Sequence, residues 1–276
     1  MKKILVAFGS SSFSSGALEH ALHISAKQKS LIVGVFIEDL SYIGYAALFG
    51  EDYFAFDAHL LNRMEKESEG KTEENMASFM EKCNAAGVNF KTHLDKGVPA
   101  NELVKESRYA DLIILGYQDF FSGVAGEGSI LKDVLLDAEC PVLIVPGNYM
   151  PIENILFAFD SKPHSAFAIK QFTLLFPEDI FHAAATLIHI VKSKEESTEQ
   201  HGGLIREYLK AHYVNLNEET ISGQPDDAIL NFAEMQANPL VVMGAYGRSG
   251  VSRFFSRSTA GKLLKDKSLP VFIAHK

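Results

Sequence analysis

The chain has 276 residues, enough for two domains of ordinary size that each bury a core. Hydrophobic residues make up 47% of the chain and charged residues 22%, a composition typical of a soluble globular protein. The formal net charge of −9 gives no electrostatic argument for binding nucleic acid or an anionic membrane surface.

Targeting and membrane segments are also disfavoured. The apolar run after the first three residues ends at Gly9, so it is shorter than the roughly 7–15 residues of a secretory signal. No segment approaches the roughly 18 consecutive apolar residues that a membrane-spanning helix needs. The two cysteines, Cys83 and Cys140, indicate no disulfide framework. We therefore expect a cytoplasmic protein.

The first half of the chain alternates apolar strand patterns with amphipathic helix patterns. Strands are predicted at 3–8, 30–38, 88–97, 111–116 and 141–146. Helices are predicted at 16–28, 62–87, 99–110 and 129–139. This regular alternation of strand and helix predicts a doubly wound parallel sheet with helices on both faces.

The connection after the second strand is long and rich in aromatic residues. Its tyrosines and phenylalanines between 41 and 60 are Tyr42, Tyr45, Phe49, Tyr53, Phe54 and Phe56. Two interpretations stay open for this aromatic segment. It extends the helix that covers one face of the sheet, or it forms a lid or a surface for a protein partner.

The second half of the chain repeats the first. The string ILVAFG near the start returns as ILFAFD, and ILKDVLLDAECPVLIVP returns as KLLKDKSLPVFIAH. Gly116 and Gly244 are separated by almost the same number of residues as Pro141 and Pro270. A spacing that is so nearly constant indicates a duplicated domain.

The duplication predicts two repeats, at 1–147 and 152–276, joined by a short linker. Strands of the second repeat are predicted at 153–159, 185–191, 214–223, 239–245 and 270–276. Helices are predicted from Ser165, over 225–236 and after Ser258. The charged segment 192–203, which ends in two glycines, is predicted to be a solvated connection. The expected fold class is therefore two tandem α/β domains of the flavodoxin-like or Rossmann-like type.

Ligands of open parallel sheets bind at the carboxyl ends of the strands, near the point where the strand order reverses. In the second repeat, three strand ends supply candidate ligand-binding residues there: Asp160 with Ser161, Gly223 with Gln224, and Gly244 with the loop after it. In that loop, Gly247 would let backbone N–H groups approach a phosphate. Ser258 and Thr259 would open a helix whose N-terminus favours anions. A tight turn is the structural alternative for the two glycines.

Three arginines, Arg248, Arg253 and Arg257, crowd the same loop. Guanidinium groups bind phosphate in a bidentate manner, so these residues favour an anionic ligand. Two opposite roles stay open for Arg257: its side chain would either contact a phosphate or fill the space that a phosphate needs.

These segments resemble the nucleotide loop of the universal stress protein family, and the two repeats follow that family's order over almost the whole chain. The family pattern has an aspartate at the end of the first strand, a Gly-x-x-Gly turn, and a later Gly-Ser or Gly-Thr that opens a helix. Asp160, Gly244 and Gly247 match it, whereas Arg257 stands in the place of the third glycine.

The resemblance implies an adenine nucleotide alpha hydrolase-like fold. It also implies that Asp160 lies on the adenine and ribose side of a bound nucleotide and that the glycine loop holds the phosphates. The implied ligand is ATP, with AMP or ADP as alternatives and Mg²⁺ as the accompanying ion. The family's dimers further imply that the final strands of the two repeats pair within this chain as a pseudo-dimer; a homodimer of two chains stays open.

The first repeat is expected to be degenerate. Gly9 stands where the second repeat has Asp160, and Asp119 stands where it has Gly247, so an acidic side chain would repel phosphate there. His20 and His23 lie three residues apart, but a surface or capping role is favoured over a metal site.

The resulting functional hypothesis is a non-catalytic stress-response regulator in which nucleotide binding biases domain packing or the choice of an unknown protein partner. Catalysis would be limited to slow ATP hydrolysis without an identifiable base. One alternative is an interaction scaffold that has lost nucleotide binding. Another is a protein that binds a different small ligand through the aromatic segment.

Overall fold

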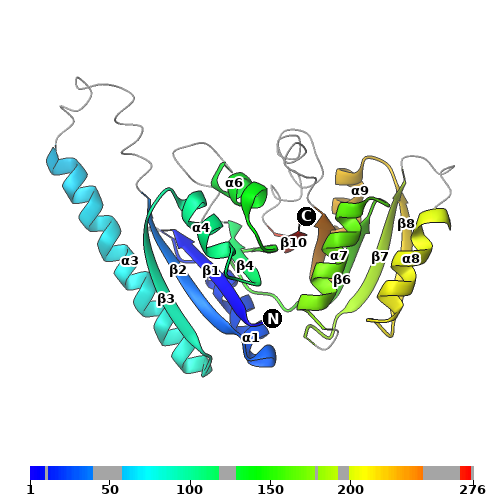
Figure 1. The fold of residues 1–276 in the computed structure, drawn as a ribbon, viewed down its shortest axis with the longest axis horizontal. Helices are drawn as coiled ribbons and strands as arrows, with labels where there is room; N and C mark the ends of the chain where they lie inside the picture. Colours follow the sequence, from blue (N-terminus) through cyan, green and yellow to red (C-terminus); the bar gives the residue numbers. More distant parts are fainter. Residues whose placement is uncertain are drawn as a thin grey trace, which may run out of the picture. The chain divides into compact units, whose positions relative to one another are not determined.

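The structure is a computed structural model that describes residues 1–9, 12–39, 58–117, 129–177, 180–191, 199–244 and 268–274. The chain divides into two compact units, Lys2–Glu139 and Cys140–Lys276, the latter together with Met1. Both are built from mostly parallel strands and helices, which confirms the predicted α/β fold class (Figure 1). The predicted aromatic residues between 41 and 57 lie outside the described residues.

Four parallel strands of the first unit run in the order β3-β2-β1-β4. They are β1 (Lys3–Gly9), β2 (Leu31–Asp39), β3 (Phe90–Gly97) and β4 (Leu112–Gly116). The helices are α1 (Ser15–Gln28), α3 (Ala58–Ala86), α4 (Pro99–Ser107) and α6 (Ser129–Asp137). Right-handed crossovers place α1 and α3 on one face of the sheet and α4 and α6 on the other.

The core of the first unit is dominated by phenylalanines. Phe8 of β1 stacks on Phe36 of β2 with ring centroids 4.9 Å apart, and Phe79 of α3 meets both rings edge-on. Gly34 makes room for Phe79, because a Cβ at Gly34 would lie 2.9 Å from Cζ of that ring. The buried aromatic cluster therefore attaches the 29-residue helix α3 to the sheet.

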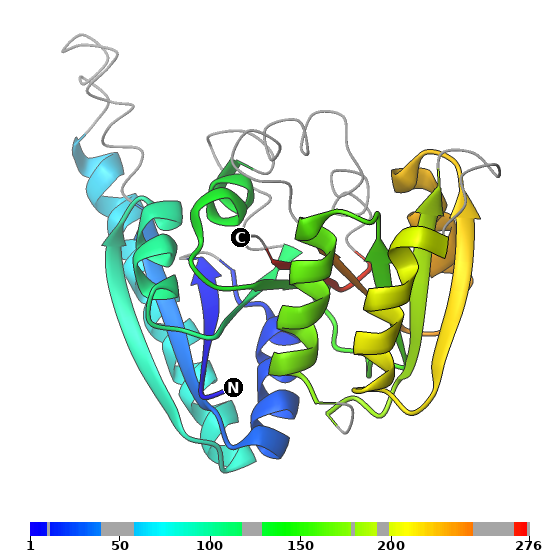
Figure 2. The same cartoon turned by 45° about the vertical axis from the view of Figure 1, so that its right-hand side comes forward.

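The second unit contains a sheet in the order β5-β10-β9-β6-β7-β8. Its strands are β5 (Val142–Val145), β6 (Asn154–Phe159), β7 (Ala184–Val191), β8 (Leu216–Ser222), β9 (Pro239–Gly244) and β10 (Val271–Ala274). Its helices are α7 (Pro163–Leu175), α8 (Glu199–Lys210) and α9 (Pro225–Glu234). Helices α7 and α8 lie on one face of this sheet and α9 on the other (Figure 2).

The final strands of the two repeats pair with each other. β10 runs parallel to β9 and antiparallel to β5, with Val271 opposite Ile144 and Ile273 opposite Val142. This confirms the predicted pairing within the chain. β5 thus packs in the second compact unit, although its sequence belongs to the first repeat. The repeat boundaries at 147 and 152 remain predictions about the duplicated sequence.

Helix α8 corrects the prediction of a solvated connection over 192–203, because Glu199–Gly203 are helical. The prediction of a solvated connection rested on the many charged residues of this segment, which the exposed face of a helix also carries. A Cβ at Gly202 would lie only 2.8 Å from Cε1 of His189, which is buried in β7. Gly202 is therefore explained by the close approach of helix and strand.

The two glycines of α8 should respond oppositely to alanine. Gly203→Ala meets no atom within 4 Å and should stabilise the protein by about 0.5–1 kcal/mol, because alanine is the better helix former. Gly202→Ala should destabilise it by about 1–2 kcal/mol, since the His189 ring has little room to shift. Urea unfolding of the two variants measures the change in the free energy of unfolding for each. A Gly202→Ala variant that is more stable than the parent would contradict the packing of α8 on β7.

None of the helices within the described ranges is long and apolar enough to cross a membrane.

Candidate functional site

The strand order of the second unit reverses at β6. The chain leaves β6 for its neighbour β7 and later returns as β9 on the opposite side of β6. A crevice at such a reversal, at the carboxyl ends of the strands, is where open α/β sheets bind ligands. Asp160 follows β6 directly and Gly244 ends β9. The fold therefore brings these two predicted site residues to the same edge of the sheet.

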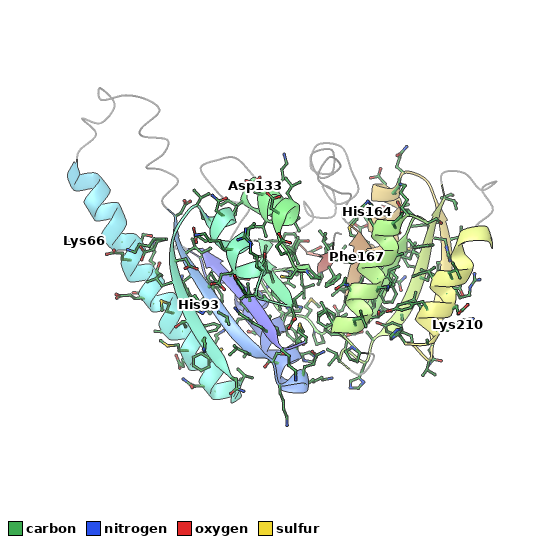
Figure 3. All side chains as sticks on the ribbon, in the orientation of Figure 1. Lys66, His93, Asp133, His164, Phe167 and Lys210 are labelled. Atoms are coloured by element: carbon green, nitrogen blue, oxygen red, sulfur yellow. The ribbon has the colours of Figure 1, made fainter. Side chains whose placement is uncertain are left out.

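The first turn of α7 packs against Gly244. Helix α7 begins at Pro163, two residues earlier than predicted. His164 and Phe167 lie in its first two turns (Figure 3). A Cβ at Gly244 would lie 2.4 Å from the carbonyl carbon and oxygen of His164, and 2.7 Å from the backbone nitrogen of Ser165. Gly244 is therefore required for packing whether or not a phosphate binds nearby.

Asp160 organises the turn between β6 and α7. Its Oδ1 accepts a hydrogen bond from the backbone N–H of Lys162 at 3.1 Å and one from the Ser165 hydroxyl at 2.8 Å. Its Oδ2 accepts from the Lys162 ammonium at 2.9 Å. Ser161 completes the turn with a left-handed backbone, at φ of 62°. The predicted Asp160 and Ser161 thus form one compact turn at the strand end.

The turn is buried on one side and open on the other. Ser165 is 5% exposed, whereas the side chains of Asp160 and Lys162 are 25% and 53% exposed. A carboxylate and an ammonium therefore face solvent at the reversal point. Lys162 was not among the site residues predicted from the sequence, although a lysine two residues after Asp160 in a turn is placed to pair with that carboxylate.

Gln224 lies apart from this turn. It is exposed at the N-cap position of α9 and makes no side-chain capping bond. β7 separates β8 from β6, so the end of β8 is two strand spacings, about 10 Å, from the end of β6. The remaining predicted site residues, Gly247, Arg248, Arg257, Ser258 and Thr259, lie outside the described residues.

At the equivalent strand end of the first unit, the described residue in the place of Asp160 is Gly9, which carries no carboxylate. Gly9 ends β1, and Phe13 stacks on Phe8 with ring centroids 4.9 Å apart and planes 7° from parallel. Lys82 of α3 lies over the Phe13 ring, 5.7 Å from its centroid. Beside this strand end, the described residues therefore form an aromatic stack with a covering cation.

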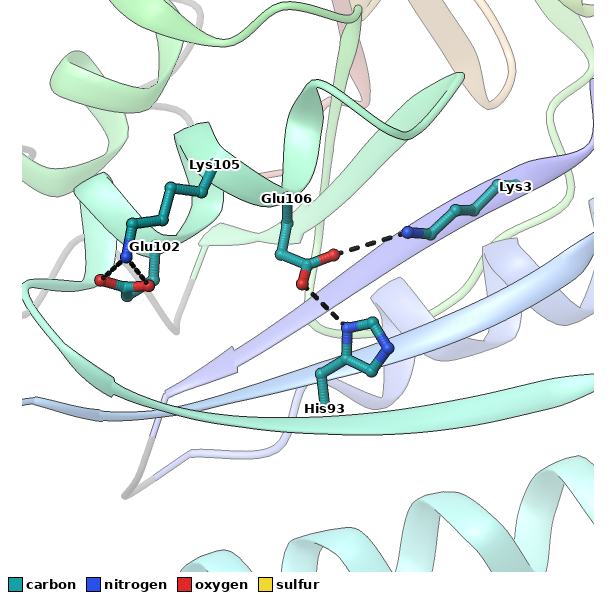
Figure 4. A network of polar contacts seen from close by, with 5 residues as sticks. All are labelled: Lys3, His93, Glu102, Lys105 and Glu106. Atoms are coloured by element: carbon teal, nitrogen blue, oxygen red, sulfur yellow. Dashed lines mark hydrogen bonds and ion pairs between the residues drawn. The ribbon is translucent and has the colours of Figure 1, made fainter.

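A second polar cluster in the first unit joins α4 to the sheet (Figure 4). Glu106 accepts from Nδ1 of His93 at 2.9 Å and from Lys3 at 3.5 Å, and Glu102 pairs with Lys105 at 2.7 Å. Burial, followed by the charges of Glu106 and Glu102, raises the pKa of Asp95 above its ordinary value. Among the described residues, no group of three histidines, cysteines or carboxylates is placed to hold a metal ion. We assign this cluster a structural role.

The fold resembles that of solved universal stress proteins. A universal stress protein from Archaeoglobus fulgidus superposes with a TM-score of 0.74 at 20% sequence identity, covering 99% of this chain and 96% of the other. A protein from Pseudomonas aeruginosa described as a putative universal stress protein superposes with a TM-score of 0.64 at 16% identity, covering 100% and 93%. At these identities the likeness establishes the fold alone.

Comparison of sequences finds relatives from the same family. Universal stress protein MJ0531 of Methanocaldococcus jannaschii is 30% identical over 152 residues, which span 52% of this chain and 81% of the relative. Universal stress protein Slr1230 of Synechocystis is 26% identical over 167 residues, which span 58% of this chain and 56% of the relative. The model of the universal stress protein family matches residues 1–146 and 176–275. The chain therefore belongs to the universal stress protein family.

Proposed function

We propose that this protein is a non-catalytic stress-response regulator that binds an adenine nucleotide, ATP or AMP, at the Asp160 end of the second repeat. The observation that carries the proposal is the placement of a partly exposed carboxylate at the point where the strand order reverses. A carboxylate there offers acceptors to the hydroxyl and amino groups of a nucleoside. Binding would act by favouring one domain arrangement or partner over another.

The proposal assigns the two ends of the nucleotide to different segments. Asp160 and Ser161 would face the base and sugar, and Gly247, Arg248, Ser258 and Thr259 would face the phosphates and an accompanying Mg²⁺. Arg257 would contact a phosphate or close the site. Gly9 at the end of β1 supports a first repeat that binds no triphosphate, because it offers no carboxylate where the second repeat has Asp160.

An interaction scaffold without nucleotide is a second candidate, and two observations favour it. Gly244 is explained by the close approach of α7, and the Asp160 carboxylate is hydrogen-bonded within its own turn. Both matching residues therefore have structural roles that need no ligand. In this reading the aromatic segment would supply the contact surface, or would bind another small ligand.

Calorimetric titration with ATP and Mg²⁺ separates the two candidates. The nucleotide proposal predicts binding that weakens about tenfold or more in Asp160→Asn, because hydrogen bonds to charged groups contribute about 1.5–3 kcal/mol. Asp111→Asn is the matched control: Asp111 also accepts backbone N–H bonds, from Lys2 and Lys3, but it lies in the first unit at the start of β4. The control should bind ATP as the parent does.

Arg257→Gly decides the role of that arginine. If the parent does not bind ATP and this variant does, Arg257 closes the site. If neither protein binds ATP, the nucleotide proposal is rejected and the interaction scaffold is the remaining candidate.

A further inference from the structure

The face of the second sheet that α8 covers contains a buried histidine (Figure 2). His189, near the end of β7, is 5% exposed, and its ring meets the Phe159 ring edge-on with centroids 6.0 Å apart. A Cβ at Gly202 of α8 would lie only 2.8 Å from Cε1 of the same ring. Among the described residues, Nε2 of His189 has no hydrogen-bond partner. The ring is therefore packed against β6 and α8 with one nitrogen unsatisfied.

An ion pair that joins α8 to β8 lies beside this nitrogen. Nε of Arg206, on α8, donates to both carboxylate oxygens of Glu218, on β8, at 2.7 Å. Oε2 of Glu218 also lies 3.7 Å from Nε2 of His189, beyond hydrogen-bond distance. Of the described elements around the ring, β8 and α8 present these two charged groups, Lys210 of α8 acts on Glu218, and β6 presents the uncharged Phe159. A positive charge on His189 would therefore face a carboxylate that attracts it and a guanidinium that repels it.

Burial has the larger influence on the ring. It lowers the pKa of His189 below its ordinary value, and the charge of Glu218 opposes this shift. A protonated ring is thus better accommodated where α8 has moved away and water reaches the imidazolium. The packed position of α8 is favoured in full above a pH of about 6.5, where the ring is neutral in both states, and less so as the pH falls below that value.

We propose that α8 is an acid-sensitive cover of the second sheet, which leaves β7 and β8 when His189 is protonated. The imidazolium would also compete with Arg206 for the Glu218 carboxylate and so weaken the ion pair that holds the helix. Ile205 and Leu209 of α8, which are 6% and 0% exposed, would become accessible. Acidification would therefore uncover an apolar surface of the second unit. The proposal is independent of nucleotide binding.

Hydrogen exchange of the α8 amides tests the proposal. It is followed by mass spectrometry at pH 7.5 and pH 5.0 and corrected for the pH dependence of intrinsic exchange. In the parent, the protection of α8 should fall by about threefold to 30-fold, the upper value being that of a histidine that binds a proton with a pKa of about 6.5 only when the helix is open. His189→Asn should lose most of this fall, because asparagine is not protonated. Protection of α9, on the opposite face of the sheet, reports unfolding of the whole unit and should fall less than that of α8.

His182→Asn is the matched control. His182 is exposed and has a left-handed backbone, at φ of 53°, which asparagine also adopts. The control removes the same ionisable group and should keep the fall in α8 protection. His189→Phe, which keeps a ring beside Phe159, replaces His189→Asn if thermal unfolding shows that the latter does not fold.

Three results would overturn the proposal: a fall in the parent of less than threefold, an equal fall in a His189 variant, or an equal fall in α9. The parent provides a further test that needs no folded variant. NMR titration of the His189 ring should give a pKa below about 6.5, and a higher value would equally reject the role of α8 as an acid-sensitive cover.

Discussion

Replacing Gly244 by alanine should destabilise the protein by about 3 kcal/mol. The added Cβ would fall 2.4 Å from backbone atoms of His164, and backbone in the first turn of a packed helix cannot move aside as a side-chain tip can. The variant must therefore displace α7 from β9 or distort the end of the strand. Urea unfolding followed by circular dichroism measures the loss.

Gly70→Ala is the matched control for this substitution. Gly70 lies inside α3, and a Cβ there meets no atom within 4 Å. Alanine should stabilise the helix by about 0.5–1 kcal/mol at that position. If Gly244→Ala unfolds at the parent's urea midpoint, α7 does not pack on β9 as described. Because the substitution disturbs the fold itself, it is unsuitable as a test of phosphate binding.

The second large effect should come from pH, through His20. This residue was expected at the surface or as a cap, but it is 2% exposed, with Nδ1 2.8 Å from the Gly16 carbonyl oxygen. Burial lowers the pKa of His20 to about 4 in the folded protein, against about 6.5 in an unfolded chain. Above pH 6.5 the ring is neutral in both states, so it adds no pH dependence there.

At acidic pH the folded and unfolded states differ in the protonation of His20. As the pH falls from 6.5 towards 4, the unfolded chain binds a proton at His20 that the folded protein does not, so stability is lost across this window. The loss should reach about 3 kcal/mol at its lower end. Urea unfolding between pH 7.5 and 4.5 measures it, and His20→Asn, which keeps a donor near the Gly16 carbonyl, should have a flatter profile. Equal slopes in the parent and the variant would show that His20 carries none of the pH dependence.

Sequence patterns were sufficient for most of the architecture. The period of the apolar residues distinguishes strands such as β1 and β4 from helices such as α1, because a strand buries alternate or continuous positions and a helix buries every third or fourth. The duplication indicated that the two repeats share one fold, and the resemblance to the family's dimers implied that their final strands pair. It also directed attention to Asp160 and Gly244, because strand ends are local features that a sequence marks well.

Other features depended on contacts between segments far apart in the chain. The charged segment 192–203 was predicted to be a connection, but the close approach of Gly202 to the ring of His189 belongs to a helix packed on β7. Gly244 was predicted to lie in a phosphate-binding turn, and its contact with α7 explains the glycine equally well. His20 is on a helix face whose burial depends on what packs over it. Between Asp160 and Lys162, Ser161 has a left-handed backbone, which no residue-type preference predicts strongly for a serine.

The amino-acid sequence by itself determined the fold class, the duplication and the strand ends where a ligand would bind, because these follow from local periodicity and from glycine and proline placement. Only the tertiary structure decided which glycines are needed for packing, which histidine is buried, and which cation lies on the Asp160 carboxylate. Those outcomes depend on atomic distances between elements, and such distances arise only when the elements pack together.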